Sequence, residues 1–295
     1  MEKRILGLDL GGTFIKYCLF DENDDFLLKG KETTPSNIED FIVLIKELVN
    51  HFKPIEGIAI SMPGFIDTQR GYAKTGGAIK YLDDTDVVKL FKDLFHVWVS
   101  VENDGRCATL AELEIGNLKD INNGIAIIVG TAIGGGIVVN REVLRGKHLI
   151  AGEISFMSGI IDEYPSYNSV FATYCGAHGI YREVEKTTGI KNMSGIEAFK
   201  RIKTGDKKVE EALKTVCHRL AVYLYNLQVV IDPEKFVIGG GISAEPLFIQ
   251  YIQEGIDDIY SKNKDLPVKP TIDVCLYRND ANLLGALYNY KRNKK

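Results

Sequence analysis

The segment 8–13 reads Leu-Asp-Leu-Gly-Gly-Thr and ends a short apolar run. Gly11 and Gly12 carry no side chain, so their backbone N–H groups can approach a phosphate tail closely, and the Thr13 hydroxyl can add a donor. Asp9 could hold the hydrated Mg²⁺ that accompanies ATP, because this ion prefers oxygen ligands and keeps its waters. The alternative is an ordinary glycine hairpin with a surface aspartate. The segment matches neither a Walker A sequence nor a GxGxxG fingerprint.

A second glycine-rich segment, 130–136, reads Gly-Thr-Ala-Ile-Gly-Gly-Gly and also follows a buried strand-like run. The backbone of Gly130, Gly134 and Gly135, with the hydroxyl of Thr131, could form a second phosphate cradle that faces the first. A flexible turn is the alternative. Because a strand-like run followed by the bare backbone of glycines occurs twice in the sequence, the pattern favours two anion-binding turns.

A carboxylate and an amide stand side by side at Asn103 and Asp104. A sugar hydroxyl is a poor nucleophile at neutral pH. Asp104 could orient it and accept its proton as a phosphoryl group is transferred, which makes this residue the candidate general base. Asn103 offers both a donor and an acceptor to a neighbouring hydroxyl. The alternative is that the two residues only cap the helix that follows.

Two further segments could complete such a site. Glu153 follows a loop at 151–152, and its carboxylate could hold two vicinal sugar hydroxyls; a solvated acid is the alternative. Gly239, Gly240 and Gly241 follow a strand-like run, and their bare backbone would let a flat adenine lie against the chain. A simple strand-to-helix turn is the alternative for these three glycines.

Strands and helices must position these residues, and the sequence predicts both in alternation. The expected strands are Arg4–Asp9, Ile15–Phe20, Gly57–Met62, Val97–Val101, Gly124–Gly130, Ile137–Val139 and Phe236–Ile238. The expected helices are Ile38–Phe52 (capped by Ser36 or Asn37), Val87–Phe95, Asp104–Gly116, Val209–Val230 and Asn282–Arg292. Apolar residues recur in these helices at helical spacing. The alternation indicates an α/β fold.

Length and composition place the chain among ordinary globular proteins. Its 295 residues suggest two domains, with a boundary near the polar stretch 118–123. The formal net charge of −4 does not favour a nucleic-acid or anionic-membrane partner. The five cysteines form no CxxC pair, which indicates reduced thiols and no zinc site.

No targeting or membrane segment is expected. The first apolar run stops at Asp9, which is too short for the core of a signal peptide. The longest uncharged apolar stretch, Ile125–Val139, is shorter than the ~20 residues a spanning helix needs. We therefore expect a soluble, cytoplasmic protein.

Taken together, these segments resemble the ROK family (repressors, uncharacterised frames and sugar kinases) within the actin-like ATPase superfamily. The pieces run from Ile5 to Gly285, nearly the whole chain, and their order and spacing carry the resemblance. The matching segments are 7–13, Ser61–Asp67, Glu102-Asn103-Asp104 with the helix that contains Ala108, 130–136, and Gly239–Ile242.

The resemblance implies two RNase H-like lobes with a cleft between them. The N-terminal lobe would span 1–120, with the C-terminal helix 282–295 packing back on it, and the C-terminal lobe would span 121–281. ATP with Mg²⁺ would bind mainly to the C-terminal lobe, with its phosphates between both glycine turns. A homodimer is the family expectation.

The resemblance also implies a kinase that phosphorylates the 6-hydroxyl of a hexose or hexose derivative. The sugar would lie against Asn103, Asp104 and Glu153, near Gly64. Glucose, N-acetylmannosamine and β-glucosides are the substrate classes that remain open.

Two departures from the family pattern bear on the sugar. The glutamate motif reads Glu153-Ile154-Ser155-Phe156, so Phe156 stands where the family has histidine. The zinc cluster of the family is absent, because Ser158–Gly179 holds only Cys175. We therefore expect no structural zinc, as in N-acetylmannosamine kinase-like and β-glucoside kinase-like members. A sugar substituted at C1 or C2 would suit such a pocket better than plain glucose.

Three rival functions remain to be separated from the kinase. A sugar-responsive repressor would carry a helix-turn-helix before the first phosphate motif, and only four residues precede Ile5. A non-catalytic sugar or nucleotide sensor would bind ligand without turnover. An actin-like filament protein would not need Asn103, Asp104 and Glu153 together.

Overall fold

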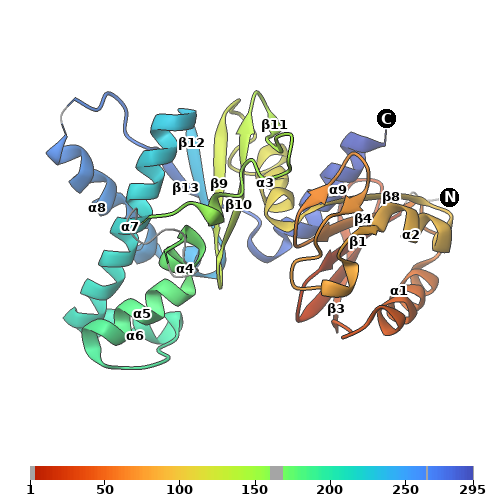
Figure 1. Cartoon of the computed structure of the whole chain (residues 1–295), viewed down its shortest axis with the longest axis horizontal. Helices are drawn as coiled ribbons and strands as arrows, with labels where there is room; N and C mark the ends of the chain where they lie inside the picture. Colours follow the sequence, from red (N-terminus) through yellow and green to blue (C-terminus); the bar gives the residue numbers. More distant parts are fainter. Residues whose placement is uncertain (1–3, 160–168, 264, 295) are drawn as a thin grey trace. The chain divides into compact units, whose positions relative to one another are not determined.

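The computed structural model describes residues 4–159, 169–263 and 265–294, and Figure 1 shows the chain coloured along its sequence. The chain divides into two compact units. The first unit contains Met1–Glu114, Arg145–Ile150 and Asp280–Lys295. The second contains Ile115–Leu144 and Ala151–Asn279. The second unit is therefore interrupted by a short segment that belongs to the first.

A five-stranded mixed sheet forms the centre of the first unit, in the order β3-β2-β1-β4-β8. Strand β1 is antiparallel to β2 and parallel to β4, and β4 is parallel to β8. The strands are β1 (Ile5–Leu10), β2 (Phe14–Phe20), β3 (Phe26–Thr33), β4 (Gly57–Met62) and β8 (Trp98–Asn103). A small second sheet contains β5 (Ile66–Asp67), β6 (Tyr72–Ala73) and β7 (Thr85–Asp86).

Helices cover both faces of this sheet. Side chains alternate between the faces of a strand. Leu6, Leu8 and Leu10 pack in one hydrophobic cluster with residues of α1 and α2. Gly7 faces the opposite side of the sheet. A Cβ added there would lie 3.6 Å from Leu283 in α9. The helices of this unit are α1 (Ile38–Phe52), α2 (Val87–Phe95), α3 (Asp104–Glu114) and α9 (Ala281–Asn293), with a 3₁₀ turn at Lys80–Leu82.

The second unit repeats the strand arrangement. Its sheet has the order β11-β10-β9-β12-β13, again with an antiparallel pair followed by parallel neighbours. The strands are β9 (Gly124–Val129), β10 (Ile133–Val139), β11 (Glu142–Val143), β12 (Lys235–Gly239) and β13 (Ile272–Val274). The helices are α4 (Phe171–Cys175), α5 (Ala177–Thr188), α6 (Gly195–Lys203), α7 (Lys207–Ile231) and α8 (Pro246–Lys262), with 3₁₀ turns at Ile154–Phe156 and Gly241–Ala244. A further 3₁₀ turn, Arg278–Asp280, lies where the chain returns to the first unit.

The α/β prediction is confirmed, and most predicted elements differ only at their ends. Asn37 caps α1 by accepting the backbone N–H of Asp40. One prediction about a strand was wrong: the strand expected at Ile137–Val139 begins at Ile133, so the three glycines at 134–136 lie within β10 rather than in the turn. The reason is the close approach of the paired strands. Gly135 has φ +144°, and a Cβ there would lie 2.0 Å from the carbonyl oxygen of Ala126.

None of the helices that the structure describes is long and apolar enough to cross a membrane.

Helix α3, which begins at Asp104, is held by a close contact with α9. A Cβ added to Gly285 in α9 would lie 1.7 Å from the carbonyl oxygen of Cys107 in α3. The two backbones can approach this far only because residue 285 has no side chain. The glycine therefore helps to fix where α3, and with it Asp104, lies on the sheet.

We expect Gly285→Ala to lower the free energy of unfolding by about 1–3 kcal/mol, the usual cost of overpacking a core, although alanine is the better helix former. Urea denaturation measures the change. Gly195→Ala is the matched control, because residue 195 begins α6 and an added Cβ there meets nothing within 4 Å. Equal effects of the two substitutions would contradict the close-packing argument.

Candidate active site

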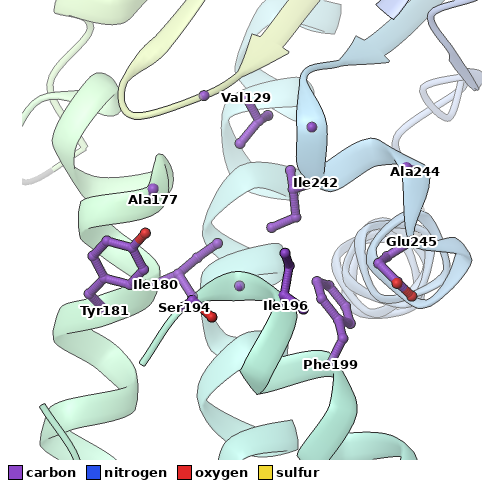
Figure 2. Close-up of a pocket in the computed structure, with 13 residues that line it drawn as sticks. Val129, Ala177, Ile180, Tyr181, Ser194, Ile196, Phe199, Ile242, Ala244 and Glu245 are labelled. Carbon is purple, nitrogen blue, oxygen red and sulfur yellow. The ribbon is translucent and has the colours of Figure 1, made fainter. Parts of the chain in front are cut away.

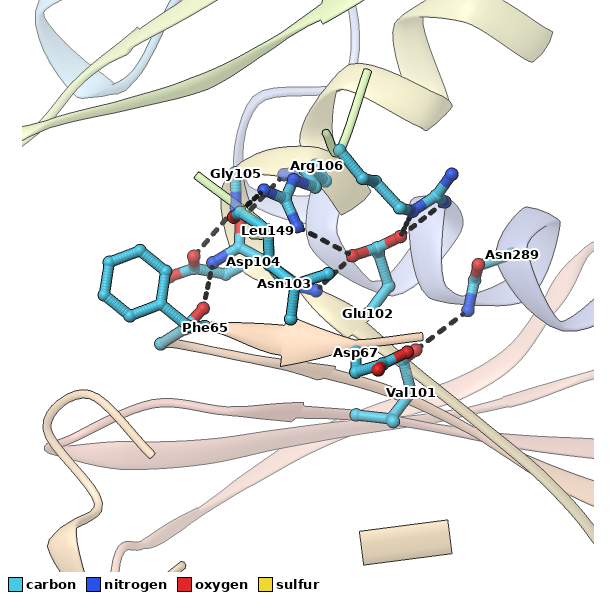
Figure 3. A network of polar contacts seen from close by, with 12 residues as sticks. Phe65, Asp67, Val101, Glu102, Asn103, Asp104, Gly105, Arg106, Leu149 and Asn289 are labelled. Atoms are coloured by element: carbon cyan, nitrogen blue, oxygen red, sulfur yellow. Dashed lines mark hydrogen bonds and ion pairs between the residues drawn. The ribbon is translucent and has the colours of Figure 1, made fainter. Parts of the chain in front are cut away.

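Asp104 is the first residue of α3 and follows β8 directly. One carboxylate oxygen, Oδ1, accepts the backbone N–H of Gly105 at 2.8 Å (Figure 3). Burial raises the pKa of the Asp104 carboxyl above its usual value, and the negative charge of Asp9 raises it further. A carboxylate with a raised pKa is a stronger proton acceptor than an ordinary aspartate, which is the property that a general base needs.

Asn103 joins the start of α3 to a neighbouring loop. Its Oδ1 accepts the backbone N–H of Arg106 at 3.1 Å, so Asn103 caps the helix as the alternative interpretation held. Its Nδ2 donates to the carbonyl oxygen of Gly64 at 3.0 Å. An amide has a second N–H and a second lone pair, so these bonds leave room for a sugar hydroxyl. The role of Asn103 as a sugar ligand stays a prediction.

The loop at Gly64 cannot accommodate a side chain. Gly64 has φ +103°, and a Cβ there would lie 2.0 Å from the carbonyl oxygen of Thr75. Only glycine adopts this conformation at low cost. The structure thus brings three predicted sugar ligands together in the first unit: Gly64 and Asp104 are both linked to Asn103, one by a hydrogen bond and the other by the chain.

Asp9 lies at the end of β1 and is almost fully buried. Its Oδ1 accepts the hydroxyl of Ser61 at 2.9 Å and the amide of Asn282 at 3.1 Å. The ammonium of Lys16 lies 3.6 Å from Oδ2. No group of three or more His, Cys, Asp or Glu side chains in the described ranges could hold a metal ion. A single carboxylate of this kind could hold a hydrated Mg²⁺ through water, and this role of Asp9 stays a prediction.

The turn after β1 is tightly closed. The N–H of Gly11 donates to Phe14, and the hydroxyl of Thr34 donates to the carbonyl oxygen of Gly11. A Cβ on Gly12 would lie 2.6 Å from the Cβ of Ala78, so packing alone already requires glycine at this position. Gly12 and Thr13 are exposed, and their part in binding phosphate stays a prediction.

In the second unit, two of the predicted nucleotide-binding segments come together. Gly130 and Gly241 both line a cavity of about 540 Å³ (Figure 2). A Cβ on Gly241 or Gly134 would meet nothing within 4 Å, whereas one on Gly240, with φ +89°, would lie 2.0 Å from the carbonyl oxygen of Val129. Bare backbone next to open space is what a closely bound ligand would require.

The other walls of this cavity are largely apolar. They come from the end of β9, from α5, from α6 and its cap, and from the turn that follows Gly241: Val129, Ala177, Ile180, Tyr181, Ser194, Gly195, Ile196, Phe199, Ile242, Ala244 and Glu245. Tyr181 and Ile196 are exposed although they are apolar. An apolar slot with a few polar groups suits a flat heterocycle. The sequence patterns did not point to α5 or α6, since neither carries a motif.

The remaining predicted residues lie elsewhere in the second unit. Thr131 is exposed, and its carbonyl oxygen lies 3.1 Å from Nδ1 of His178. Glu153 precedes the 3₁₀ turn Ile154–Phe156, and Phe156 is 58% exposed. Gly239 is the last residue of β12 and is packed against Ile128 and Cys275. The roles of these residues in binding stay predictions.

The five cysteines, including Cys175 in α4, are buried, and none of them forms a disulfide. Part of the stretch where the zinc cluster was expected to be absent, residues 160–168, lies outside the described residues. The prediction that the protein has no structural zinc therefore stays a prediction.

Known proteins match this chain over almost its whole length. A family model described as "ROK family" matches residues 5–293. A β-glucoside kinase of Listeria monocytogenes is 28% identical over 97% of each chain. An N-acetylmannosamine kinase of Escherichia coli is 27% identical over 95% of this chain and 96% of its own. A solved ROK family protein of Streptococcus pneumoniae, in complex with sucrose, has a TM-score of 0.90 at 28% identity and covers 100% of this chain and 99% of its own.

The raised pKa of Asp104 predicts a pH-dependent cost to stability. The folded protein binds this proton more tightly than the unfolded chain does. The contribution of the protonated Asp104 carboxyl to the free energy of unfolding is therefore fully present below the unfolded pKa of about 3.9. It is lost as the pH rises through the folded pKa. We expect Asp104→Asn to be more stable than the wild type at pH 7, because it removes a charge from a poorly hydrated position.

The difference in the free energy of unfolding between the wild type and Asp104→Asn should shrink as the pH falls toward about 4. Chemical denaturation across this pH range measures it. Asp93→Asn on α2 is the control, because the carboxylate of Asp93 is 61% exposed. A wild type that is more stable than Asp104→Asn at pH 7 would contradict the argument.

Proposed function

The chain belongs to the ROK family, with its two RNase H-like lobes of the actin-like ATPase fold, and on that premise we propose that it is an ATP-dependent sugar kinase. The reaction is transfer of the γ-phosphoryl group of ATP to the 6-hydroxyl of a hexose or hexose derivative. The observation that carries the proposal is the Asp104 carboxylate, which is poorly hydrated, has its pKa raised by burial and by the charge of Asp9, and stands beside the buried amide of Asn103.

Asp104 acts as the general base in this proposal. Its carboxylate orients the sugar hydroxyl and accepts its proton while the new phosphate ester forms. Asn103 and the backbone near Gly64 hold neighbouring hydroxyls, and Glu153 binds two further hydroxyls. No covalent intermediate with the protein is required, because positioning and electrostatic stabilisation account for most catalysis of phosphoryl transfer.

The adenine of ATP is proposed to occupy the apolar cavity beside Gly241. The flat ring would lie against the backbone of Gly240 and Gly241, and the phosphates would reach the glycines of 130–135 and of 11–13. Mg²⁺, held through water near Asp9, would neutralise charge on the phosphates when it is bound. Asp9 itself is kept in place by Ser61 and Asn282.

We propose a hexose with a substituent at C1, of the β-glucoside class, as the substrate. Phe156 stands where the family has a histidine and presents an exposed apolar ring, which suits a bulkier group better than a free hydroxyl. The similar proteins named above include a β-glucoside kinase and a protein bound to sucrose, and both ligands are substituted at C1. N-acetylmannosamine and glucose are the competing substrates.

A non-catalytic sensor or regulator of the same family is the alternative. It would bind sugar and nucleotide without releasing ADP. A cytoplasmic location and a homodimer complete the proposal. The first is supported by five cysteines that form no disulfide, and light scattering tests the second.

The direct test is ADP release with a panel of sugars. We expect β-glucosides to give a higher kcat/KM than glucose, and the product to carry its phosphate on the 6-hydroxyl. We expect Asp104→Asn to fold normally and to lose at least about a hundredfold in kcat, the usual contribution of a general base. Asp93→Asn should keep full activity. A fully active Asp104→Asn protein would refute the assignment, and binding without any ADP release would favour the sensor.

Side chains added to Gly241 test the nucleotide pocket. Residue 241 tolerates a Cβ without a clash, so larger side chains should fill the cavity while the protein stays folded. We expect Gly241→Ala to raise the KM for ATP slightly and Gly241→Val to raise it about tenfold or more, which corresponds to about 1.4 kcal/mol of lost binding. The KM for the sugar should not change. Equal effects on both constants would show that the cavity is not the nucleotide site.

A further inference from the structure

Residues 145–150 belong to the first unit although the chain on both sides of them belongs to the second. Two arginines hold this segment. Arg145 donates from Nε and Nη2 to Oε2 of Glu102, at 3.0 and 2.6 Å. Arg106 donates from Nη2 to the carbonyl oxygen of Leu149 at 2.6 Å. Glu102 and Arg106 lie on either side of Asn103 and Asp104 in the sequence, so the segment is tied to the chain next to the candidate base.

The carboxylate of Glu102 is completely buried, and both of its oxygens make polar contacts. Its side chain is 0% exposed, that of Arg106 is 1% exposed, and that of Arg145 is 28% exposed. The second oxygen, Oε1, accepts the backbone N–H of Asn103 at 2.8 Å and lies 3.9 Å from Nη1 of Arg106. Figure 3 shows these contacts around Glu102. A buried charge of this kind is tolerated only when it is paired and hydrogen-bonded.

We propose that Glu102, Arg106 and Arg145 form a positioning network that sets the place of Asp104, and that Arg145 is the member that controls it. This inference rests on the proposed kinase function and adds three residues to it. None of the three is proposed to contact the substrate or ATP. They act through the peptide of Asn103, which Glu102 binds directly.

The route from the network to the candidate base is short. Glu102 fixes the N–H of Asn103, and the side chain of Asn103 in turn binds the N–H of Arg106 and the carbonyl of Gly64. A shift of Glu102 would therefore move the helix cap, the Gly64 loop and Asp104 together. A misplacement of about 1 Å can reduce the rate of an enzyme about a hundredfold.

A purely stabilising role is the main competing explanation, but buried ion pairs do not in general increase stability over apolar residues of the same size. The two roles predict different results. A stabilising pair would change the fraction of folded protein and leave the kcat of each folded molecule intact. A positioning network would lower kcat in molecules that are fully folded.

Chemical rescue of Arg145→Ala separates these roles. Because Arg145 is partly exposed, a guanidinium ion at millimolar concentration, well below denaturing levels, can enter the space that its side chain leaves. We expect kcat per folded molecule to fall at least tenfold, the KM for ATP to stay unchanged, and guanidinium to restore most of the lost kcat. Methylammonium at the same ionic strength should restore much less, since it lacks the planar fork that binds a carboxylate in two places.

Two controls make the outcome specific. Arg141→Ala removes a nearby arginine that donates to the carbonyl oxygens of Lys119 and Ile121 in the second unit, and it should neither lose kcat nor respond to guanidinium. Glu102→Gln keeps the shape of the side chain and the acceptor for Asn103. It should lose kcat without rescue, because Arg145 still occupies the space that guanidinium would enter.

Amide hydrogen exchange gives a readout that does not need turnover. Faster exchange at the N–H groups of Asn103, Gly105 and Arg106 in Arg145→Ala, reversed by guanidinium, is the expected result. If the wild type showed no kinase activity, the proposed function would be refuted. Hydrogen exchange would then still test the network by itself. Unchanged exchange, or a kcat per folded molecule equal to that of the wild type, would overturn the network itself.

Discussion

The placement of a poorly hydrated carboxylate at the start of α3 is the constraint on which the rest of the first unit depends. Asp104 lies where β8 ends and α3 begins, and both elements are buried around it. Burial and the nearby charge of Asp9 raise the pKa of its carboxyl, and this has a cost in stability that the surrounding packing must offset. The contact of α3 with Gly285 in α9 is one part of that packing.

The two units use the same strand order for different tasks. In both, an antiparallel pair with a turn near glycine is followed by parallel strands. In the first unit, the end of the first strand carries Asp9 and the end of the last carries Asn103, so polar side chains gather at one edge of the sheet. In the second unit, the corresponding edge carries Gly130 and Gly241 and opens onto an apolar cavity. The repeated topology therefore supplies a polar site in one unit and an apolar pocket in the other.

The sequence predicted the fold class and most strands and helices, because hydrophobic periodicity and cap residues such as Asn37 act over short distances. It was wrong about Gly134–Gly136, which were assigned to a turn and lie in β10. Three glycines in a row have the composition of a loop. What decides their structure is the approach of Ala126 from the partner strand, and this contact is not visible in the local sequence.

The residues that sequence reasoning missed all act through contacts between distant parts of the chain. Ile180 and Ile196 line the proposed nucleotide pocket from helices without any motif. Arg145 looks like an ordinary charged residue after a short strand, yet it neutralises a glutamate 43 residues earlier in the sequence. Glu102 was recognised only as the neighbour of Asn103 and Asp104. Its complete burial gives it a physical role of its own: an acid in that position must be paired, and the segment that pairs with it is drawn into the first unit. A motif can therefore indicate which residues perform the chemistry, while the groups that hold them in place become visible only when burial and charge are considered together.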